Sequence, residues 1–230
     1  MSASLTPEEA RSRLARVRAE IETAAKRAGR QSGEITLLAV SKTFPLGDVA
    51  TYLAAGQKYF GESYLQEAQD KVEKLPQAEW HFIGHLQTNK ARFAPGLFSC
   101  LHALDSLELA EKLHKRLEEK GLTLQVYVQV NVSGELSKSG LAPERLRDFL
   151  DNLAKYPTLI PQGLMTMPPY DPDPEKSRPY FRQLYELREK LAPTLRGLSM
   201  GMSGDFPVAI SEGATVVRIG TALFGDRPLS

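Results

Sequence analysis

Eight short apolar runs, each separated from the next by a helical pattern, constrain the fold most. Runs of this length are typical of strands buried on both faces of a parallel sheet. The alternation of such strands with helices in 230 residues favours a closed (β/α)8 barrel over an open doubly wound sheet. The predicted strands cover residues 35–40, 58–62, 80–85, 99–105, 124–132, 160–167, 197–203 and 216–224. The predicted helices between them cover residues 46–55, 64–75, 86–93, 106–120, 143–155, 174–191 and 206–213.

An additional helix is predicted before the first strand. Thr6 can cap its start, Pro7 suits the first helical position, and Glu9 can complete a capping box. Gly29 is a plausible C-terminal stop. The apolar residues that follow recur at helical spacing and predict one packed face: Leu14, Val17, Ile21, Ala25 and Ala28. We expect residues 1–230 to form a single α/β domain.

Composition excludes several classes of function. The formal net charge of +1 gives no electrostatic argument for nucleic acid or for an anionic membrane, and no apolar stretch is long enough to span a bilayer. A single cysteine, Cys100, excludes a disulfide framework and fits a reducing compartment, so a cytoplasmic location is expected. Cys100 is expected to be a small buried residue, and the histidines, such as His81 and His85, form no recognisable metal motif.

Polar residues follow the predicted strands, at the end of a barrel where active sites form. The first strand is followed by Lys42, whose stem would be desolvated and whose ammonium pKa would be lowered. A neutral lysine amine can form a Schiff base with a carbonyl compound. From its position alone, however, a lysine that merely ends a strand and extends its ammonium to solvent is the simpler interpretation. Other strand exits supply Ser63, Asn131 and Met165.

The last two strand exits carry small residues suited to an anion. Ser203 and Gly204 precede a helical pattern and offer a hydroxyl and backbone N–H groups, and Gly220 and Thr221 follow the eighth strand. Barrels commonly bind phosphate in the loops after strands seven and eight. Either piece alone could equally be an ordinary glycine turn with an N-cap.

Arg218 interrupts the apolar eighth strand. A buried cation is costly unless it is paired or hydrogen-bonded. Two interpretations are open from the sequence: Arg218 faces a bound cofactor inside the barrel, or it forms a structural ion pair with a neighbouring acid.

Several motifs, in order, resemble the pyridoxal 5'-phosphate homeostasis proteins, and the match extends over almost the whole chain. The motifs are Leu38-Ala39-Val40-Ser41-Lys42-Thr43, Phe60-Gly61-Glu62-Ser63-Tyr64, Trp80-His81-Phe82-Ile83-Gly84-His85, Val130-Asn131-Val132-Ser133-Gly134-Glu135, Ser137-Lys138-Ser139-Gly140, Met200-Gly201-Met202-Ser203-Gly204-Asp205 and Val217-Arg218-Ile219-Gly220-Thr221. Ser63 departs from the pattern, since the family usually has Asn there.

The resemblance implies a barrel similar to the N-terminal domain of alanine racemase, in which Lys42 holds pyridoxal 5'-phosphate as a Schiff base. It implies that Ser203, Gly204, Gly220 and Thr221 bind the phosphate and that Arg218 approaches the pyridine nitrogen. Ser63, Asn131 and Met165 are the further residues expected to contact the cofactor. An arginine at the ring nitrogen should leave that nitrogen unprotonated and weaken carbanion chemistry.

The function implied is control of pyridoxal phosphate (vitamin B6) within the cell, with delivery to apoenzymes that depend on it. Similar racemases carry a second domain that supplies a tyrosine acid/base, whereas this chain stops soon after Gly225. We therefore expect a monomer without strong catalysis. A slow pyridoxal-phosphate-dependent amino-acid racemase is the alternative, and a cofactor-free Schiff-base aldolase is a weaker third.

Overall fold

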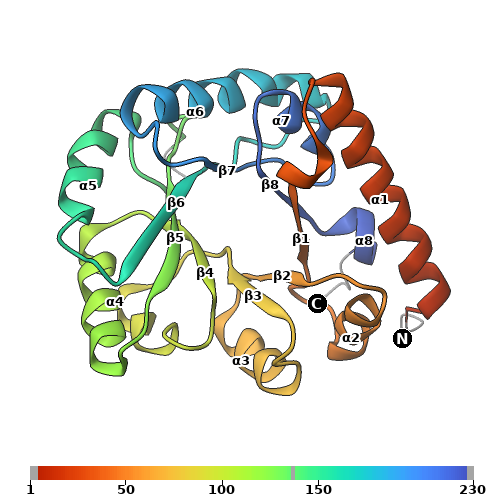
Figure 1. Ribbon diagram of the computed structural model, residues 1–230, viewed down its shortest axis with the longest axis horizontal. Helices are drawn as coiled ribbons and strands as arrows, with labels where there is room; N and C mark the ends of the chain where they lie inside the picture. Colours follow the sequence, from red (N-terminus) through yellow and green to blue (C-terminus); the bar gives the residue numbers. More distant parts are fainter. Residues whose placement is uncertain (1–4, 136–137, 227–230) are drawn as a thin grey trace.

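Parallel strands close into a barrel in which each strand pairs with the next along the chain and β8 pairs with β1 (Figure 1). The structure is a computed structural model that describes residues 5–135 and 138–226. The prediction of a closed (β/α)8 barrel, rather than an open doubly wound sheet, is confirmed. The strands are β1 Thr36–Val40, β2 Tyr59–Glu62, β3 Glu79–Phe82, β4 Cys100–Leu104, β5 Leu124–Gln129, β6 Leu159–Met165, β7 Gly197–Ser199 and β8 Val216–Ile219.

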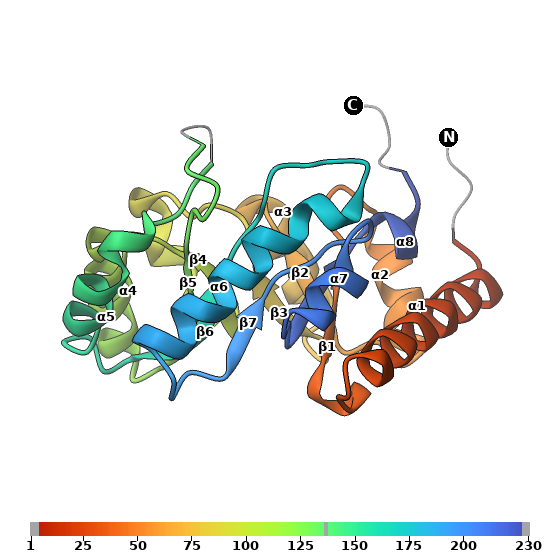
Figure 2. The ribbon, with the colours of Figure 1, turned by 90° about the horizontal axis from the view of Figure 1, so that it is seen from above.

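Helices surround the barrel and connect its strands. The α-helices are α1 Pro7–Arg27, α2 Leu46–Ala54, α3 Leu65–Lys74, α4 Leu107–Lys120, α5 Leu146–Leu153, α6 Arg178–Leu191, α7 Phe206–Ser211 and α8 Thr221–Phe224. Short 3-10 helices are η1 Ser32–Glu34, η2 Thr88–Phe93, η3 Pro143–Arg145 and η4 Pro174–Ser177. Viewed from the side, the segments that follow β5 and β6 rise on the same side of the barrel (Figure 2).

Several predicted elements differ from the structure. The strands expected at 80–85 and 124–132 end at Phe82 and Gln129, and the helices expected at 143–155 and 174–191 begin with the 3-10 helices η3 and η4. The α-helix expected at 86–93 is the 3-10 helix η2, because Pro95 prevents a helix from continuing. The strands expected at 197–203 and 216–224 end at Ser199 and Ile219. Gly201 turns the chain away after β7 with a φ of 92°, and residues 221–224 coil into α8. The shorter strands place Ser203 in a turn and Thr221 at the first position of α8, rather than in the sheet.

The N-terminal helix α1 forms as predicted. Thr6 and Glu9 make both hydrogen bonds of the capping box, and the helix buries Leu14, Val17 and Ile21. Its arginines reach the other end of the chain, since Arg13 Nη1 donates to the carbonyl of Leu223 at 3.0 Å. Within the described residues, no helix is long and apolar enough to cross a membrane.

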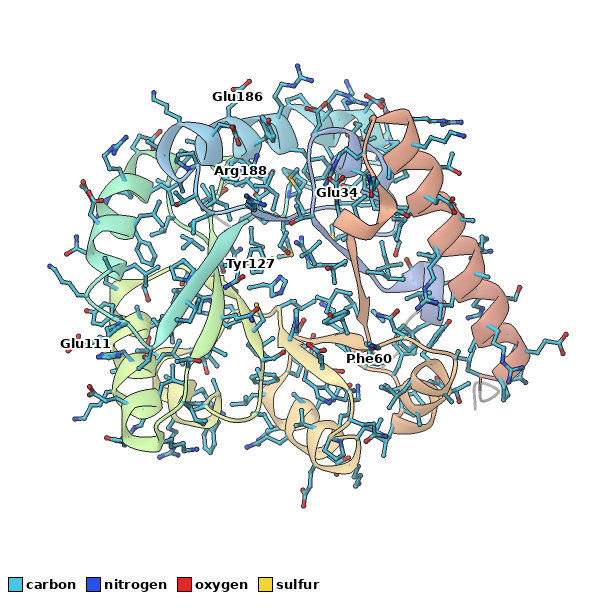
Figure 3. The ribbon with its side chains drawn as sticks, viewed as in Figure 1. Glu34, Phe60, Glu111, Tyr127, Glu186 and Arg188 are labelled. Carbon is cyan, nitrogen blue, oxygen red and sulfur yellow. The ribbon has the colours of Figure 1, made fainter. Side chains whose placement is uncertain are left out.

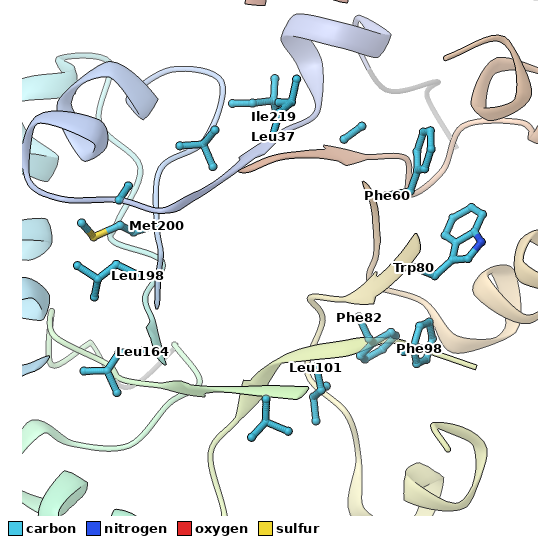
Figure 4. Close-up of a cluster of buried hydrophobic side chains, with 14 of the residues drawn as sticks. Leu37, Phe60, Trp80, Phe82, Phe98, Leu101, Leu164, Leu198, Met200 and Ile219 are labelled. Carbon is cyan, nitrogen blue, oxygen red and sulfur yellow. The ribbon is translucent and has the colours of Figure 1, made fainter. Parts of the chain in front are cut away.

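The main hydrophobic core lies between the barrel and its helices. Side chains such as Phe60, Trp80, Leu164 and Ile219 point outward from the strands in Figure 4 and belong to one buried cluster. Since neighbouring residues of a strand face opposite sides, the residues between them line the barrel interior. The apolar part of that interior consists of Leu38, Val40, Ile83, Cys100, Tyr127, Met165 and Val216.

Candidate functional site

Lys42 lies in a tight turn directly after β1. Leu38 and Val40 face the barrel interior, and Lys42 follows Val40 by two residues, beyond the strand end. The side chain of Lys42 is partly buried, as expected for a lysine at the rim. The backbone N–H of Phe44 donates to the carbonyl of Ser41 at 3.1 Å, and Thr43 adopts a positive φ of 70°. A left-handed threonine is unfavourable, so the surroundings must hold this turn in place.

A buried ionic cluster on the helix side of β1 holds the turn. The carboxylate of Glu67 accepts the N–H of Thr43 at 2.7 Å and is also bonded to the ammonium of Lys71 at 2.7 Å. The same ammonium donates to the carbonyl of Ser41 and to Glu62 Oε1, each at 2.7 Å. Helix α3 therefore fixes the backbone on both sides of Lys42.

Glu62 and Lys71 form an ion pair out of contact with solvent, with side-chain exposures of 0% and 4%. Burial raises the pKa of Glu62, whereas the charge and hydrogen bond of Lys71 lower it. Glu62 Oε2 is buried, and no described residue forms a hydrogen bond with it. Sequence reasoning missed Lys71. The available signal was its position three residues after Ala68, on the buried face of α3.

The two predicted phosphate-binding pieces meet in the structure. The hydroxyl oxygen of Ser203 accepts the backbone N–H groups of Gly220 and Ala222, each at 3.3 Å. Gly220 also lies against the end of β1, because a Cβ there would be 3.6 Å from the side chain and the carbonyl of Val40. Gly204 and Thr221 are exposed beside them. Small and polar residues thus lie next to the end of β1, which leads into the turn that carries Lys42.

Arg218 is buried inside the barrel, with 3% of its surface exposed. Nη1 donates to Ser199 Oγ at 2.7 Å and Nη2 to the carbonyl of Thr166 at 2.9 Å. Among the described residues no carboxylate lies within ion-pair distance of it, so a direct structural ion pair is not formed, although the charge of the nearby Asp205 favours the protonated guanidinium. Burial lowers the pKa of Arg218 to about 10, which still leaves the guanidinium charged at neutral pH.

A chain of buried hydrogen bonds continues from Arg218 through the interior. Ser199 Oγ lies 2.8 Å from His102 Nδ1, and His102 Nε2 lies 2.9 Å from His81 Nδ1. Arg218 can only donate, so the Ser199 hydroxyl finds its acceptor in His102 Nδ1. His102 Nε2–H then donates to His81. Sequence reasoning missed this chain, because its members come from four strands.

Both histidines of this hydrogen-bonded chain are neutral at neutral pH. Burial lowers the pKa of His81 to about 4 and lowers the pKa of His102 well below its ordinary value. Cys100 is buried beside them as expected, and burial raises the pKa of its thiol. Ligand atoms of His81, Cys100 and His102 lie within 4.8 Å of one another, a cluster that sequence spacing had not indicated. The two imidazoles use the facing nitrogens for their mutual hydrogen bond.

The remaining predicted residues lie at other strand exits. Met165 ends β6 and is buried in the interior cluster. Ser63 is partly buried, and its backbone packs so closely on Gly84 that a Cβ there would lie 2.4 Å from the Ser63 carbonyl oxygen. The amide of Asn131 donates to the carbonyls of Glu135 and Lys138 and therefore shapes its own loop. Ser137, quoted in one motif, lies outside the described residues.

A protein-family model described as the N-terminal domain of alanine racemase matches residues 12–228. Curated relatives called pyridoxal phosphate homeostasis protein are 45% identical over 221 residues in Aquifex aeolicus and 41% identical over 232 residues in Escherichia coli K12. The alignments cover 94% of this chain in both cases, and 97% and 96% of the relatives. The chain belongs to the pyridoxal phosphate homeostasis protein family.

Solved structures agree with membership of this family. PipY of Synechococcus elongatus, solved with pyridoxal phosphate bound, is 36% identical and has a TM-score of 0.81. The match covers 94% of this chain and 100% of PipY. Alanine racemase from Corynebacterium glutamicum, at 19% identity and a TM-score of 0.68, shares the fold, and the match covers 62% of that chain.

Proposed function

We propose that the chain binds pyridoxal 5'-phosphate at the carboxyl ends of its strands and serves in pyridoxal phosphate homeostasis. The observation that carries the proposal is the meeting of the Ser203–Gly220 pair with the end of β1, beside the turn of Lys42. A lysine amine and an anion pocket on adjacent strands suit a ligand that bears both an aldehyde and a phosphate. PipY, solved with this cofactor, supports the assignment.

Each predicted residue has a distinct part in this proposal. The Lys42 amine is the group that bonds to the cofactor, Ser203, Gly204, Gly220 and Thr221 surround the phosphate, and Arg218 faces the ring nitrogen. Met165, Ser63 and Asn131 border the remaining space. Bound pyridoxal phosphate supplies an aldehyde reactive toward amines and an aromatic ring that can act as an electron sink.

The charge of Arg218 favours binding and delivery over catalysis. A guanidinium that stays protonated cannot readily give a proton to a ring nitrogen, and an unprotonated ring is a weak electron sink. Ser199 and the Thr166 carbonyl hold this guanidinium inside the barrel. The homeostasis role further includes transfer to apoenzymes from a monomeric, cytoplasmic carrier made of the single domain 1–230.

The phosphate contacts are tested by equilibrium titration with pyridoxal phosphate, monitored by absorbance. Ser203→Ala removes the hydroxyl that orders Gly220 and should weaken binding roughly tenfold. Ser99→Ala, at the opposite end of the barrel, is the matched control and should bind normally. Inorganic phosphate should compete with the cofactor. Equal affinities for the two variants, or no competition by phosphate, would contradict the proposed site.

Delivery is tested with the loaded protein, an apoenzyme and an excess of a phosphatase that destroys free pyridoxal phosphate. Direct transfer predicts that the apoenzyme regains activity despite the phosphatase. Loss of all reactivation would contradict delivery while leaving binding intact. Rapid deuterium exchange at the Cα of alanine, dependent on Lys42, would instead support the racemase.

A further inference from the structure

A cavity of about 900 Å³ opens at the amino ends of the strands, opposite the turn that carries Lys42. The first residues of three strands line it: Thr36 of β1, Gly197 of β7 and Val216 of β8. The amino end of such barrels is ordinarily the structural end. A volume of this size falls in the range of about 300–1,000 Å³ that is typical of small-molecule sites.

Two glycines make room for the aromatic walls of this cavity. A Cβ at Gly197 would lie 2.6 Å from the ring of Tyr127, and a Cβ at Gly213 would lie 2.8 Å from the ring of Tyr185. Tyr127 is buried, whereas Tyr185 remains 38% exposed. Both rings line the cavity. Any larger residue at either glycine would displace a wall, so the open shape depends on these positions.

The charged lining of the cavity is mainly cationic. Arg30, Arg188 and Arg196 contribute positive charges, and Glu34 contributes a negative charge. Figure 3 shows Arg188, Tyr127 and Glu34 around the barrel opening. Arg30 is already engaged, since it pairs with Glu34 at 3.2 Å and donates to two backbone carbonyls. Arg188 is paired as well, because its Nη2 forms an ion pair with Glu189 Oε1. Among the described residues, no acid pairs with the exposed Arg196, which therefore supplies most of the positive charge available to a ligand.

Arg188 has a hydrogen-bond donor that the protein leaves unused. Its side chain is 12% exposed, and its guanidinium lies 4.7 Å from the centre of the Tyr185 ring. Nη1 donates to the carbonyl of Arg196 and Nη2 to the carboxylate of Glu189, but Nε is buried and has no hydrogen-bond partner within the described structure. A buried unpaired donor is unfavourable, and an acceptor brought by a ligand would relieve it.

We propose that this cavity binds a small organic anion that carries a carboxylate or a phosphate. The acidic group accepts from Arg188 Nε and meets the exposed Arg196, while the rest of the molecule occupies the space between Tyr127 and Tyr185. Charge-assisted hydrogen bonds to guanidinium groups are the strong and specific contacts for such acids. This second site does not depend on the cofactor site.

The test is a two-dimensional ¹H–¹⁵N NMR titration with two probes, citrate for the carboxylate arm and inorganic phosphate for the phosphate arm. Saturable shifts of the Gly197, Gly213 and Thr215 amides report on the cavity, and the Gly204 and Gly220 amides report on the cofactor site. We expect at least one probe to saturate the first set of amides. The probe that does so identifies the preferred acid.

Arg188→Met should weaken this binding roughly tenfold or more, and Arg196→Met, at an exposed position, should weaken it without endangering the fold. Arg92→Met is the matched control, because Arg92 also stacks on an aromatic ring at 4.7 Å but lies elsewhere. Failure of both probes to give saturable shifts at Gly197 and Gly213 would overturn the proposal, as would equal affinities for the three variants. Shifts at Gly204 and Gly220 alone would also overturn it and leave the cofactor site standing.

Discussion

Four interior side chains give this barrel a polar centre where such barrels are usually filled with branched apolar residues. Arg218, Ser199, His102 and His81 form a continuous hydrogen-bonded chain. Within the described residues, the guanidinium of Arg218 is hydrogen-bonded to neutral oxygens, and the charge of Asp205 supports its protonated form without a direct ion pair. Arg218 can then remain cationic and in place for the proposed ring contact.

The buried histidines predict that stability falls in mild acid. The pKa of His81 is about 4 in the folded protein, against 6.5 when unfolded, so only the unfolded state binds the proton between these values. Its contribution is complete above pH 6.5 and is lost as the pH falls towards 4. The loss is on the order of 3 kcal/mol, and His102 acts in the same direction.

Urea unfolding at several pH values between 7 and 4.5 measures this effect. The raised pKa values of Glu62 and Asp105 oppose it, so the comparison with His81→Gln isolates the histidine. The free energy of unfolding of the variant should fall less steeply than that of the parent. Parallel curves for the two proteins would show that His81 does not titrate as described.

Lys71 is predicted to be the critical partner of the buried acid. Lys71→Met leaves Glu62 charged and unpaired and should lower the free energy of unfolding by about 3–5 kcal/mol. Lys74→Met is the control, because its pair with Asp70 is more than half exposed and should contribute less than about 1 kcal/mol. Adding Glu62→Gln to Lys71→Met should recover part of the loss. Similar small effects of the two lysine variants in urea unfolding would refute this.

Single residues show where prediction from the sequence works. Lys42, Ser203 and Arg218 could be selected because each is a polar residue at a definite place in an apolar pattern. Lys71 and His102 could not be assigned roles, because their partners come from other elements and become neighbours only when the barrel closes. That Arg218 is held by neutral oxygens, and not by a direct ion pair within the described residues, required the structure for the same reason.

At the scale of the elements, β6 and β7 approach closely at a pair of glycines. A Cβ at Gly163 would lie 1.9 Å from the carbonyl oxygen of Gly197, and backbone cannot move aside as a flexible side chain can. Gly163→Ala should therefore cost about 3 kcal/mol or more, or prevent folding. Gly47→Ala in α2 is the control, because its Cβ meets nothing within 4 Å and helix propensity should raise stability slightly. Equal thermal midpoints for both variants would contradict the close approach.

Element types were predictable because the period of apolar residues differs between strands and helices. The positions at which the elements end were less predictable. The two last predicted strands extended beyond Ser199 and Ile219 because further apolar residues follow in the sequence. In the structure the chain turns at Gly201 after β7, and it forms α8 after β8. Local pattern does not reveal where inter-strand hydrogen bonding stops.

At the scale of the whole molecule, α1 joins the two ends of the chain. It buries Leu14, and its Arg13 donates a hydrogen bond to the carbonyl of Leu223 in α8. Helix α8 begins directly after Gly220. We predict that α1 and the barrel unfold as one unit. Leu14→Ala should lower stability by about 2–5 kcal/mol and shift the circular-dichroism and Trp80 fluorescence transitions together. Separate transitions would show that α1 is an independent element.

The most direct measurement for the proposed function is trapping of the cofactor on the protein. Purified protein is mixed with pyridoxal phosphate, its absorption spectrum is recorded, and borohydride reduction is followed by peptide mass mapping. We predict a yellow absorption band and a pyridoxyl group on the peptide that contains Lys42, with Lys42→Ala losing the covalent label but keeping part of its phosphate-dependent affinity. Labels scattered over surface lysines, or no band at all, would contradict the account.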